Sequence, residues 1–247
     1  MINDIEKRYL DKSYLMKNPT WDNEHTPWKT QHIKKILRKL GGAPKSICEI
    51  GCGSGGILVE LNKEFPTTDL YGFDISPDLK EFWDRNEKDG IKFKQGDFFT
   101  LEHPFYDVIL VIDVLEHLSD PFTFLQLLKG KAGHYIFHIP LDLSALSVIG
   151  EKSLLDSREK VGHIHYYTKS LALAMLTDAG YQIESWCYTN AYVNGPESNI
   201  KTHIAMLPRM LLQAINKDWG VRVLGGETLM VLASLSTTIN SECSSDE

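Results

Sequence analysis

Residues 46–61 read SICEIGCGSGGILVEL, and this stretch decides the fold. Residues 46–50 have the pattern of a strand, a glycine-rich loop follows directly, and an apolar helical pattern begins at Ile57. Glycines allow the chain to turn sharply and let a ligand lie against the main chain. A strand, a glycine loop and a helix in this order predict the first unit of a parallel sheet with a ligand at the loop.

The rest of the chain continues this alternation. Short β-like runs predict further strands at 70–74, 91–95, 108–112, 135–139, 181–189 and 227–233. Between them, helical patterns cover 29–40, 55–65, a stretch opened by Ser76 and Pro77, 121–128 and 169–179. Such alternation indicates a parallel sheet with crossover helices. Residues 142–161 fit neither pattern, and Pro208 predicts two short helices or a kink within 203–215.

Composition sets limits on the function. A chain of 247 residues, 43% of them hydrophobic, can form one α/β domain with a modest insertion. The net charge of -7 argues against a general electrostatic grip on nucleic acid. No apolar run is long enough to span a bilayer, and the first residues lack a signal-peptide core, so we expect a cytoplasmic protein. The four cysteines form no CxxC pair, which predicts neither disulfides nor structural zinc.

The glycine loop alone leaves two ligand classes open. Gly51, Gly53 and Gly56 satisfy the dinucleotide pattern G-x-G-x-x-G, and Asp74 follows at the distance expected of a ribose-binding acid. A nicotinamide-dependent dehydrogenase is therefore one interpretation. Glu49, just before the first glycine, favours a different one, because a carboxylate suits a cationic ligand and would lie poorly beside a pyrophosphate.

Two further motifs favour the cationic ligand. The third predicted strand ends in QGDF, residues 95–98, whose acid and aromatic ring could bind the amine and the face of a purine. The fourth is followed by DVLEHLSDP, residues 113–121, which places polar groups at its C-terminal end, where open α/β sheets bind ligands. A dehydrogenase does not require that arrangement.

Together these segments resemble the class I S-adenosylmethionine-dependent methyltransferases of types 11 and 23, and are similar to the ubiquinone-biosynthesis O-methyltransferases. The resemblance covers roughly residues 45–190 and rests on EIGCGSG, YGFDIS, QGDFF, YDVILVIDVLEHLSDP, GHIHYYT and GYQIES. It implies a Rossmann-like, seven-stranded, mostly parallel sheet with helices on both faces. It also implies S-adenosyl-L-methionine as cofactor and S-adenosyl-L-homocysteine as product.

The resemblance also implies a domain plan and a donor site. We expect an arm or lid with the first helix at 1–40, the methyltransferase domain at 41–235 with acceptor-side insertions at 141–165 and 190–226, and a disordered tail at 236–247. The implied donor-binding residues are Glu49, Gly51, Gly53, Gly55, Asp74, Ile75, Asp97, Phe98 and Asp113. Alternatively, Asp97 only caps a turn and Phe98 only fills the core.

Methyl transfer is an in-line displacement, so a base is needed only if the acceptor arrives protonated. Histidine titrates near neutral pH, and His117, His163 and His165 are the candidate catalytic residues, with His138 a further one. Each has a structural alternative. His117 could anchor a turn, His138 could be a satisfied strand residue, and one of His163 and His165 must point away if that stretch is extended.

A metal is an alternative to a simple base. In small-RNA 2'-O-methyltransferases and some quinone O-methyltransferases, an E-x-x-E-H pattern at this position binds a divalent ion. Here Asp113, Glu116 and His117 match the spacing with Asp in place of the first Glu, and His163 or His165 could add a ligand. We expect no metal, and keep this set as the alternative.

The expected function is methyl transfer to an O or N atom of a small-molecule metabolite. We expect no nucleic-acid or membrane partner, and a monomer or homodimer. Two alternatives remain open. The first is a metal-assisted RNA 2'-O-methyltransferase, and the second is a catalytically silent donor-binding module whose arm docks a partner protein.

Overall fold

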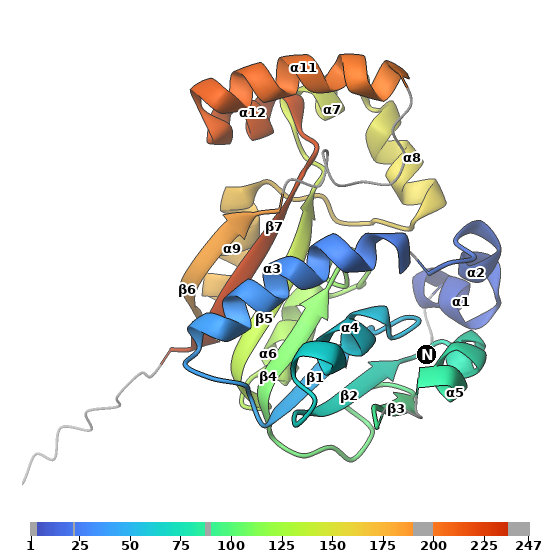
Figure 1. The fold of residues 1–247 in the computed structure, drawn as a ribbon. Coiled ribbons are helices and arrows are strands. Elements are labelled where there is room, and N and C mark those ends of the chain that lie inside the picture. Colours follow the sequence, from blue (N-terminus) through green and yellow to red (C-terminus); the bar gives the residue numbers. More distant parts are fainter. Residues whose placement is uncertain (1–3, 22, 87–89, 190–199, 237–247) are drawn as a thin grey trace, which may run out of the picture.

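The computed structural model describes residues 4–21, 23–86, 90–189 and 200–236 (Figure 1). Seven strands form one sheet in the order β3-β2-β1-β4-β5-β7-β6. Strands β1 to β5 pair in parallel, and β7 runs antiparallel to both β5 and β6. This confirms the predicted Rossmann-like fold. The strands are β1 (Ser46–Ile50), β2 (Asp69–Asp74), β3 (Lys92–Gln95), β4 (Tyr106–Ile112), β5 (Ala132–Leu141), β6 (Tyr181–Tyr188) and β7 (Glu227–Leu235).

Helices cover both faces of this sheet. They are α1 (Asp4–Leu10), α2 (Ser13–Lys17), η1 (Asn23–His25), α3 (Thr26–Lys39), α4 (Gly56–Glu64), η2 (Pro77–Leu79), α5 (Lys80–Asn86), α6 (Pro121–Leu128), α7 (Ala145–Gly150), α8 (Lys152–Lys160), α9 (Lys169–Asp178), α11 (Ile200–Ile215) and α12 (Lys217–Leu224).

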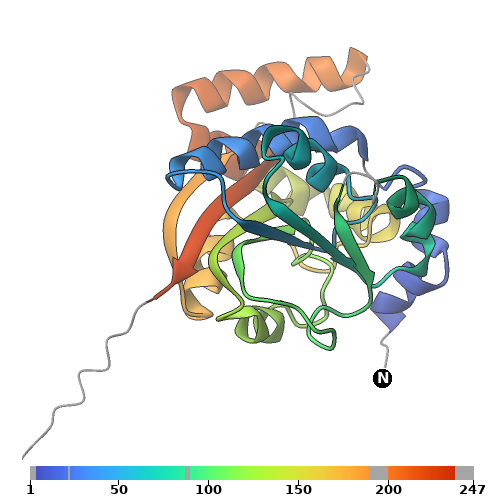
Figure 2. The ribbon, with the colours of Figure 1, turned by 60° about the horizontal axis from the view of Figure 1, so that its bottom comes forward.

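The central strand β4 shows why the sheet is covered on both sides. Val108 and Leu110 pack toward α3 and α4, whereas Ile109 and Val111 pack toward α6 and α9. All four side chains are at most 1% exposed. A continuous apolar strand of this kind is stable only between two layers of helices, and Figure 2 shows α3 and α6 on opposite faces.

Two local predictions are wrong. Residues 142–161 contain α7 and α8, and α7 begins with a capping box between Ser144 and Ser147. Of the two alternatives at Pro208, two short helices are wrong, since α11 runs through it as one helix, whereas a kink there stays a prediction. The break comes at Asn216, whose side chain caps α12. Helix α12 packs closely on α11, where a Cβ on Gly220 would lie 2.4 Å from Cγ of Gln213.

The strand order places the ligand crevice. Connections from β1 and β4 lead to opposite sides of the sheet, and open α/β sheets bind ligands at the C-terminal ends of strands where the order reverses. This edge of the sheet is therefore the expected ligand crevice. Figure 1 shows α7, α8, α11 and α12 beyond this end of β5. Within the described ranges, no helix combines the length and apolar composition needed to cross a bilayer. The predicted features at 190–199 and 237–247 lie outside the described residues.

Candidate active site

The glycine loop joins β1 to α4 at the crevice. Gly51, Gly53 and Gly55 all have positive φ, at 72°, 50° and 81°. Gly51 has a second constraint, because a Cβ there would lie 2.6 Å from Cγ2 of Val114. Its amide donates to the carbonyl of Phe73 at 2.7 Å, which fixes the loop against β2. The loop is thus held close to the sheet.

Two carboxylates lie beside this loop. Glu49, near the end of β1, is 2% exposed, and its Oε2 has no hydrogen-bond partner among the described residues. Burial raises the pKa of Glu49, and Asp74 and Asp113 raise it further while Lys29 opposes them. Asp74 accepts hydrogen bonds from the amides of Gly53 and Ser76, both at 2.9 Å. Burial nevertheless raises the pKa of Asp74. The two acids thus place two carboxyl groups at the C-terminal ends of β1 and β2.

A third carboxylate, Asp113, follows β4. Its φ of 54° is unusual for a residue other than glycine. The side chain is held from two sides, with Oδ1 2.5 Å from Nδ1 of His138 and Oδ2 2.6 Å from Nζ of Lys29. Although burial opposes it, these two contacts keep the pKa of Asp113 well below its usual range. His138 is completely buried and also contacts Thr228, so it is a satisfied strand histidine.

The predicted adenine-binding residues lie further along the same edge. The Asp97 carboxylate accepts a hydrogen bond from the amide of Phe99 at 2.9 Å, as a turn cap does. Phe98 is 3% exposed and packs on Phe73 and His103, with ring centroids 5.1 and 4.1 Å away. Ile75, after β2, is half-buried. These contacts match the structural alternative for Asp97 and Phe98, and their role toward adenine stays a prediction.

A separate polar cluster forms after Asp113. Glu116 is completely buried, and neither carboxylate oxygen has a hydrogen-bond partner among the described residues. Nε2 of His117 and Nε2 of His163 each lie 3.9 Å from its Oε1. The carbonyl of Glu116 accepts hydrogen bonds from the amides of Ile164 and His165, which brings the 163–165 stretch alongside. The three side chains offer one ligand atom each within 4.8 Å of one another.

The side chains of His163 and His165 point in different directions, as expected if this stretch is extended. His163 joins the cluster, and its Nδ1 lies 2.6 Å from Oδ2 of Asp142. His165 turns away, because its Nε2 contacts the carbonyl of Leu118 at 2.9 Å. Burial raises the pKa of Glu116 well above its usual value. Burial, together with His163, lowers the pKa of His117 to about 4, so this ring is neutral at pH 7.

The arm, described over residues 4–21 and 23–29, contacts both the glycine loop and the Glu116 cluster. A Cβ on Gly53 would lie 3.8 Å from Cε3 of Trp21, and the rings of Tyr9 and His117 are 5.9 Å apart. Lys29 reaches Asp113 from the first turn of α3. Sequence reasoning did not identify Lys29 or Asp142 as site residues. Both lie outside the motifs, and only the fold brings them to the crevice.

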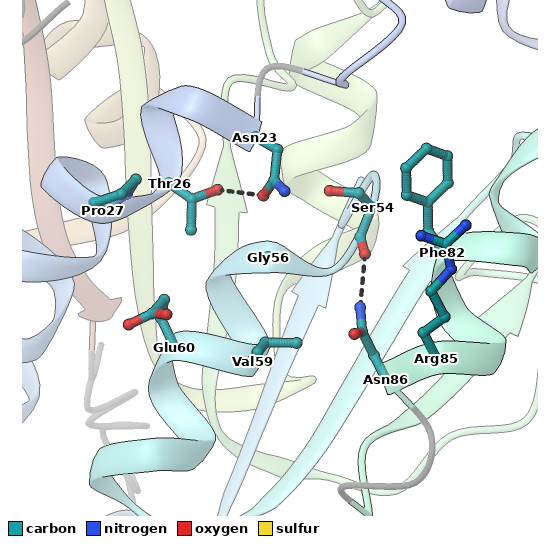
Figure 3. Close-up of a pocket in the computed structure, with 10 residues that line it drawn as sticks. All are labelled: Asn23, Thr26, Pro27, Ser54, Gly56, Val59, Glu60, Phe82, Arg85 and Asn86. Carbon is teal, nitrogen blue, oxygen red and sulfur yellow. Dashed lines mark hydrogen bonds between the residues drawn. The ribbon is translucent and has the colours of Figure 1, made fainter. Parts of the chain in front are cut away.

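A cavity of about 420 Å³ lies beside Ser54 and Gly56, at the end of the glycine loop where α4 begins (Figure 3). It lies between the arm, α4 and α5, and its lining residues are Asn23, Thr26, Pro27, Ser54, Gly56, Val59, Glu60, Phe82, Arg85 and Asn86. Hydrogen bonds from Thr26 to Asn23 and from Asn86 to Ser54 tie its rim together. None of the predicted donor-binding residues lines this cavity, so it is distinct from the crevice.

The chain is similar to several known methyltransferases. Over 185 residues the chain is 29% identical to the malonyl-[acyl-carrier protein] O-methyltransferase of Halalkalibacterium halodurans, which covers 63% of this chain and 68% of that protein. Two solved structures share the fold. The N-methyltransferase NodS of Bradyrhizobium japonicum has a TM-score of 0.59 and 15% identity over 95% of this chain and 100% of that one. Magnesium protoporphyrin IX methyltransferase of Synechocystis has a TM-score of 0.55 and 17% identity over 85% of this chain and 84% of that one.

The family itself follows from the sequence match. Residues 23–185 match the methyltransferase domain family, and this range contains the glycine loop, the three carboxylates and the Glu116 cluster. S-adenosylmethionine is the cofactor of these enzymes. Binding of its cationic groups by Glu49, Asp74 and Asp113 stays a prediction. The chain belongs to the methyltransferase domain family, within the class I S-adenosylmethionine-dependent superfamily.

Proposed function

We propose that this protein transfers the methyl group of S-adenosylmethionine to an oxygen or nitrogen atom of a small organic acceptor. The observation that carries the proposal is the cluster of a buried Glu116 with the half-buried His117 and His163, which follows β4 close to Asp113. Burying an unpartnered carboxylate costs free energy, and such groups gather where chemistry needs them.

His163 is the best-placed base. Asp142 contacts its Nδ1, which leaves Nε2 directed toward the cluster and would stabilise the imidazolium once a proton is taken up. In the transfer, the acceptor lone pair forms the new bond to the methyl carbon while the carbon–sulfur bond breaks. The acceptor proton passes to His163, and S-adenosylhomocysteine leaves. His117 is neutral at pH 7 and is the second candidate, whereas His165 has its Nε2 engaged by a backbone carbonyl.

Three observations support a small acceptor with an apolar part. The net charge of -7 disfavours a polyanion. Relatives named above act, by their names, on a malonyl thioester carrier and on a porphyrin. The predicted acceptor-side insertions form α7, α8, α11 and α12, which expose large apolar side chains near the crevice end of the sheet, among them Leu146, Ile149, Leu211 and Ile215. Such surface suits an apolar ligand.

A metal-assisted reaction is the second candidate, and the structure changes its ligand set. Asp113 is engaged by Lys29 and His138, so it does not fit the role that the spacing indicates. Glu116, His117 and His163 fit better, because one carboxylate and two imidazoles are common ligands of divalent transition-metal ions. A metal held there would act as a Lewis acid on the acceptor oxygen. Asp142 would orient His163 as an outer-shell carboxylate does.

Transfer from isotopically labelled S-adenosylmethionine tests the function directly. The acceptor panel contains phenols, catechols, carboxylic acids, amines and a structured RNA, with and without a chelator. We expect product from a small acceptor, with loss in His163→Ala and retention in His165→Ala, the matched control. Product from RNA alone would favour the RNA methyltransferase. Donor binding without any product would favour a silent donor-binding module.

A further inference from the structure

The cavity between the arm, α4 and α5 has no part in the methyl transfer proposed above. Its volume of about 420 Å³ is within the range of pockets that hold small molecules. Figure 3 shows Phe82 and Arg85 of α5 on one side of it. In the same view, Asn23 and Thr26 of the arm lie on the other side, and Ser54 of the glycine loop lies between the two sides. Three elements therefore contribute side chains to one space.

Ser54 offers an unpaired hydroxyl to this cavity. The residue is 6% exposed, and its hydroxyl has no hydrogen-bond partner among the residues that the structure describes. Its side chain is directed toward the arm in Figure 3. Its carbonyl oxygen, in contrast, accepts a hydrogen bond from Nδ2 of Asn86 at 3.2 Å. Buried hydroxyl groups almost always have a partner, so this one indicates a ligand atom that accepts a hydrogen bond.

The first turn of α4 adds further donors. This helix has nine residues, it begins at Gly56, and no side chain caps its N-terminus. The amides of residues 56–58 therefore have no acceptor within the helix. Gly56 and Val59 both line the cavity. The amides and the dipole at a helix N-terminus favour an anion, and here the Ser54 hydroxyl lies next to them.

Arg85 supplies a full positive charge to the same lining. Its guanidinium carbon lies 6.0 Å from the ring centre of Phe82, in the last two turns of α5. Across the described ranges, no carboxylate forms an ion pair with this guanidinium. The acid in the lining, Glu60, is instead paired with Lys63, whose Nζ lies 2.5 Å from its Oε1. The cavity thus has an excess of hydrogen-bond donors, beside the apolar surfaces of Phe82 and Val59.

We propose that this cavity binds a phosphomonoester of a small aromatic or apolar compound. Its phosphate lies between Arg85, Ser54 and the first turn of α4, and its apolar part lies against Phe82 and Val59. A guanidinium binds two phosphate oxygens at once, and the third oxygen is then available to the hydroxyl and the helix amides. A carboxylate has only two oxygens and satisfies fewer of these donors. The site is separate from the donor crevice and does not depend on the proposed methyl transfer.

Calorimetric titration of the full chain with phenyl phosphate tests this proposal. We expect a Kd below about 1 mM, and at least about 10-fold weaker binding of inorganic phosphate, benzoate and phenol, each of which lacks one part of the ligand. Saturating S-adenosylhomocysteine should leave the affinity for phenyl phosphate unchanged within about 2-fold. Competition between the two ligands would overturn the proposal, because it would place phenyl phosphate in the donor crevice.

Variants of the lining locate the binding. Arg85→Met should lower the affinity for phenyl phosphate at least about 10-fold, and Ser54→Ala should lower it about 3-fold. Glu60→Gln should raise it about 2-fold, because a negative charge leaves the lining. Arg38→Met is the matched control, since this exposed arginine of α3 pairs with Glu64, and it should bind phenyl phosphate normally. Thermal unfolding without ligand checks that each variant is folded. A wild-type chain that does not bind phenyl phosphate, or a folded Arg85→Met that binds it equally well, would overturn the proposal.

Discussion

Oδ2 of Asp142 lies 2.6 Å from Nδ1 of His163, and Nε2 of the same ring lies 3.9 Å from Oε1 of Glu116. Asp142 comes from the segment after β5 and His163 from the segment after α8, so the pair links two connections across the crevice. A carboxylate on one imidazole nitrogen fixes the tautomer and directs the other nitrogen to its target. This relationship governs the first two predictions.

Replacing Asp142 with Asn should leave donor binding intact and reduce turnover. The amide keeps the shape but removes the charge that stabilises the imidazolium, and we expect kcat to fall about 10- to 100-fold. Steady-state kinetics on an acceptor identified in the panel would measure this, with S-adenosylhomocysteine affinity as the check on the fold. Asp156→Asn on the surface of α8 is the matched control. An unchanged kcat in Asp142→Asn would mean that His163 takes no part in the reaction.

The affinity for a divalent metal ion should depend on His163 and not on His165. If Glu116, His117 and His163 hold a divalent ion, Co²⁺ added to the chelator-treated protein should give a ligand-field absorption spectrum. We expect His163→Ala to weaken binding at least about 10-fold, and His165→Ala to leave it unchanged. Equal loss in both variants would show that the effect is structural. The absence of any Co²⁺ spectrum in the wild-type chain would leave His163 as a metal-free base.

Glu49→Gln should make the protein more stable and bind the donor less well. Burial raises the pKa of Glu49 in the folded protein above its value in the unfolded chain. The contribution of this group to stability is therefore fully present below the unfolded-state pKa, and it is lost as the pH rises through the raised folded-state pKa. The variant should therefore gain about 1–2 kcal/mol at pH 8 and much less at pH 4. Each kcal/mol corresponds to about 2–4 °C in Tm for a chain of this size.

Thermal unfolding of the ligand-free protein at several pH values would measure that gain. Glu60→Gln, on the surface of α4, controls for the loss of one acidic residue. Glu49→Gln should also bind S-adenosylhomocysteine at least about 10-fold more weakly, since the donor ammonium loses its carboxylate partner. A fall in stability at pH 8 would mean that Glu49 is paired in the ligand-free state and that its position is structural.

Asp74→Asn should lower donor affinity with little change in the sheet. Each carboxylate oxygen already accepts one backbone amide, from Gly53 or Ser76, and each has a further lone pair for a ribose hydroxyl. We expect about 10-fold weaker binding of S-adenosylhomocysteine by calorimetry. Asp69→Asn, at the exposed start of the same strand, is the control. NAD should not bind either protein, and tight NAD binding would restore the dehydrogenase interpretation.

The elements of the fold could be predicted because their signals are local. Strand β4 is apolar at every position from 108 to 112, Gly51 and its neighbours mark the turn into α4, and Thr168 caps α9. Two local predictions failed. Pro208 usually interrupts a helix, yet α11 runs through it as one helix. The polar stretch 142–161 forms helices that its weak periodicity does not indicate.

The sequence by itself determined the family of this protein and predicted where the donor binds. Glu49, Gly51 and Asp74 lie at the ends of consecutive elements in one βαβ unit, so their spacing along the chain already predicts their proximity. Only the tertiary structure decided the rest. It separated His163 from His165, engaged Asp113 with Lys29 and His138, and brought Asp142 to His163. These contacts join residues 21 to 84 positions apart, and no local pattern encodes them because they depend on how loops and the arm pack over the sheet edge.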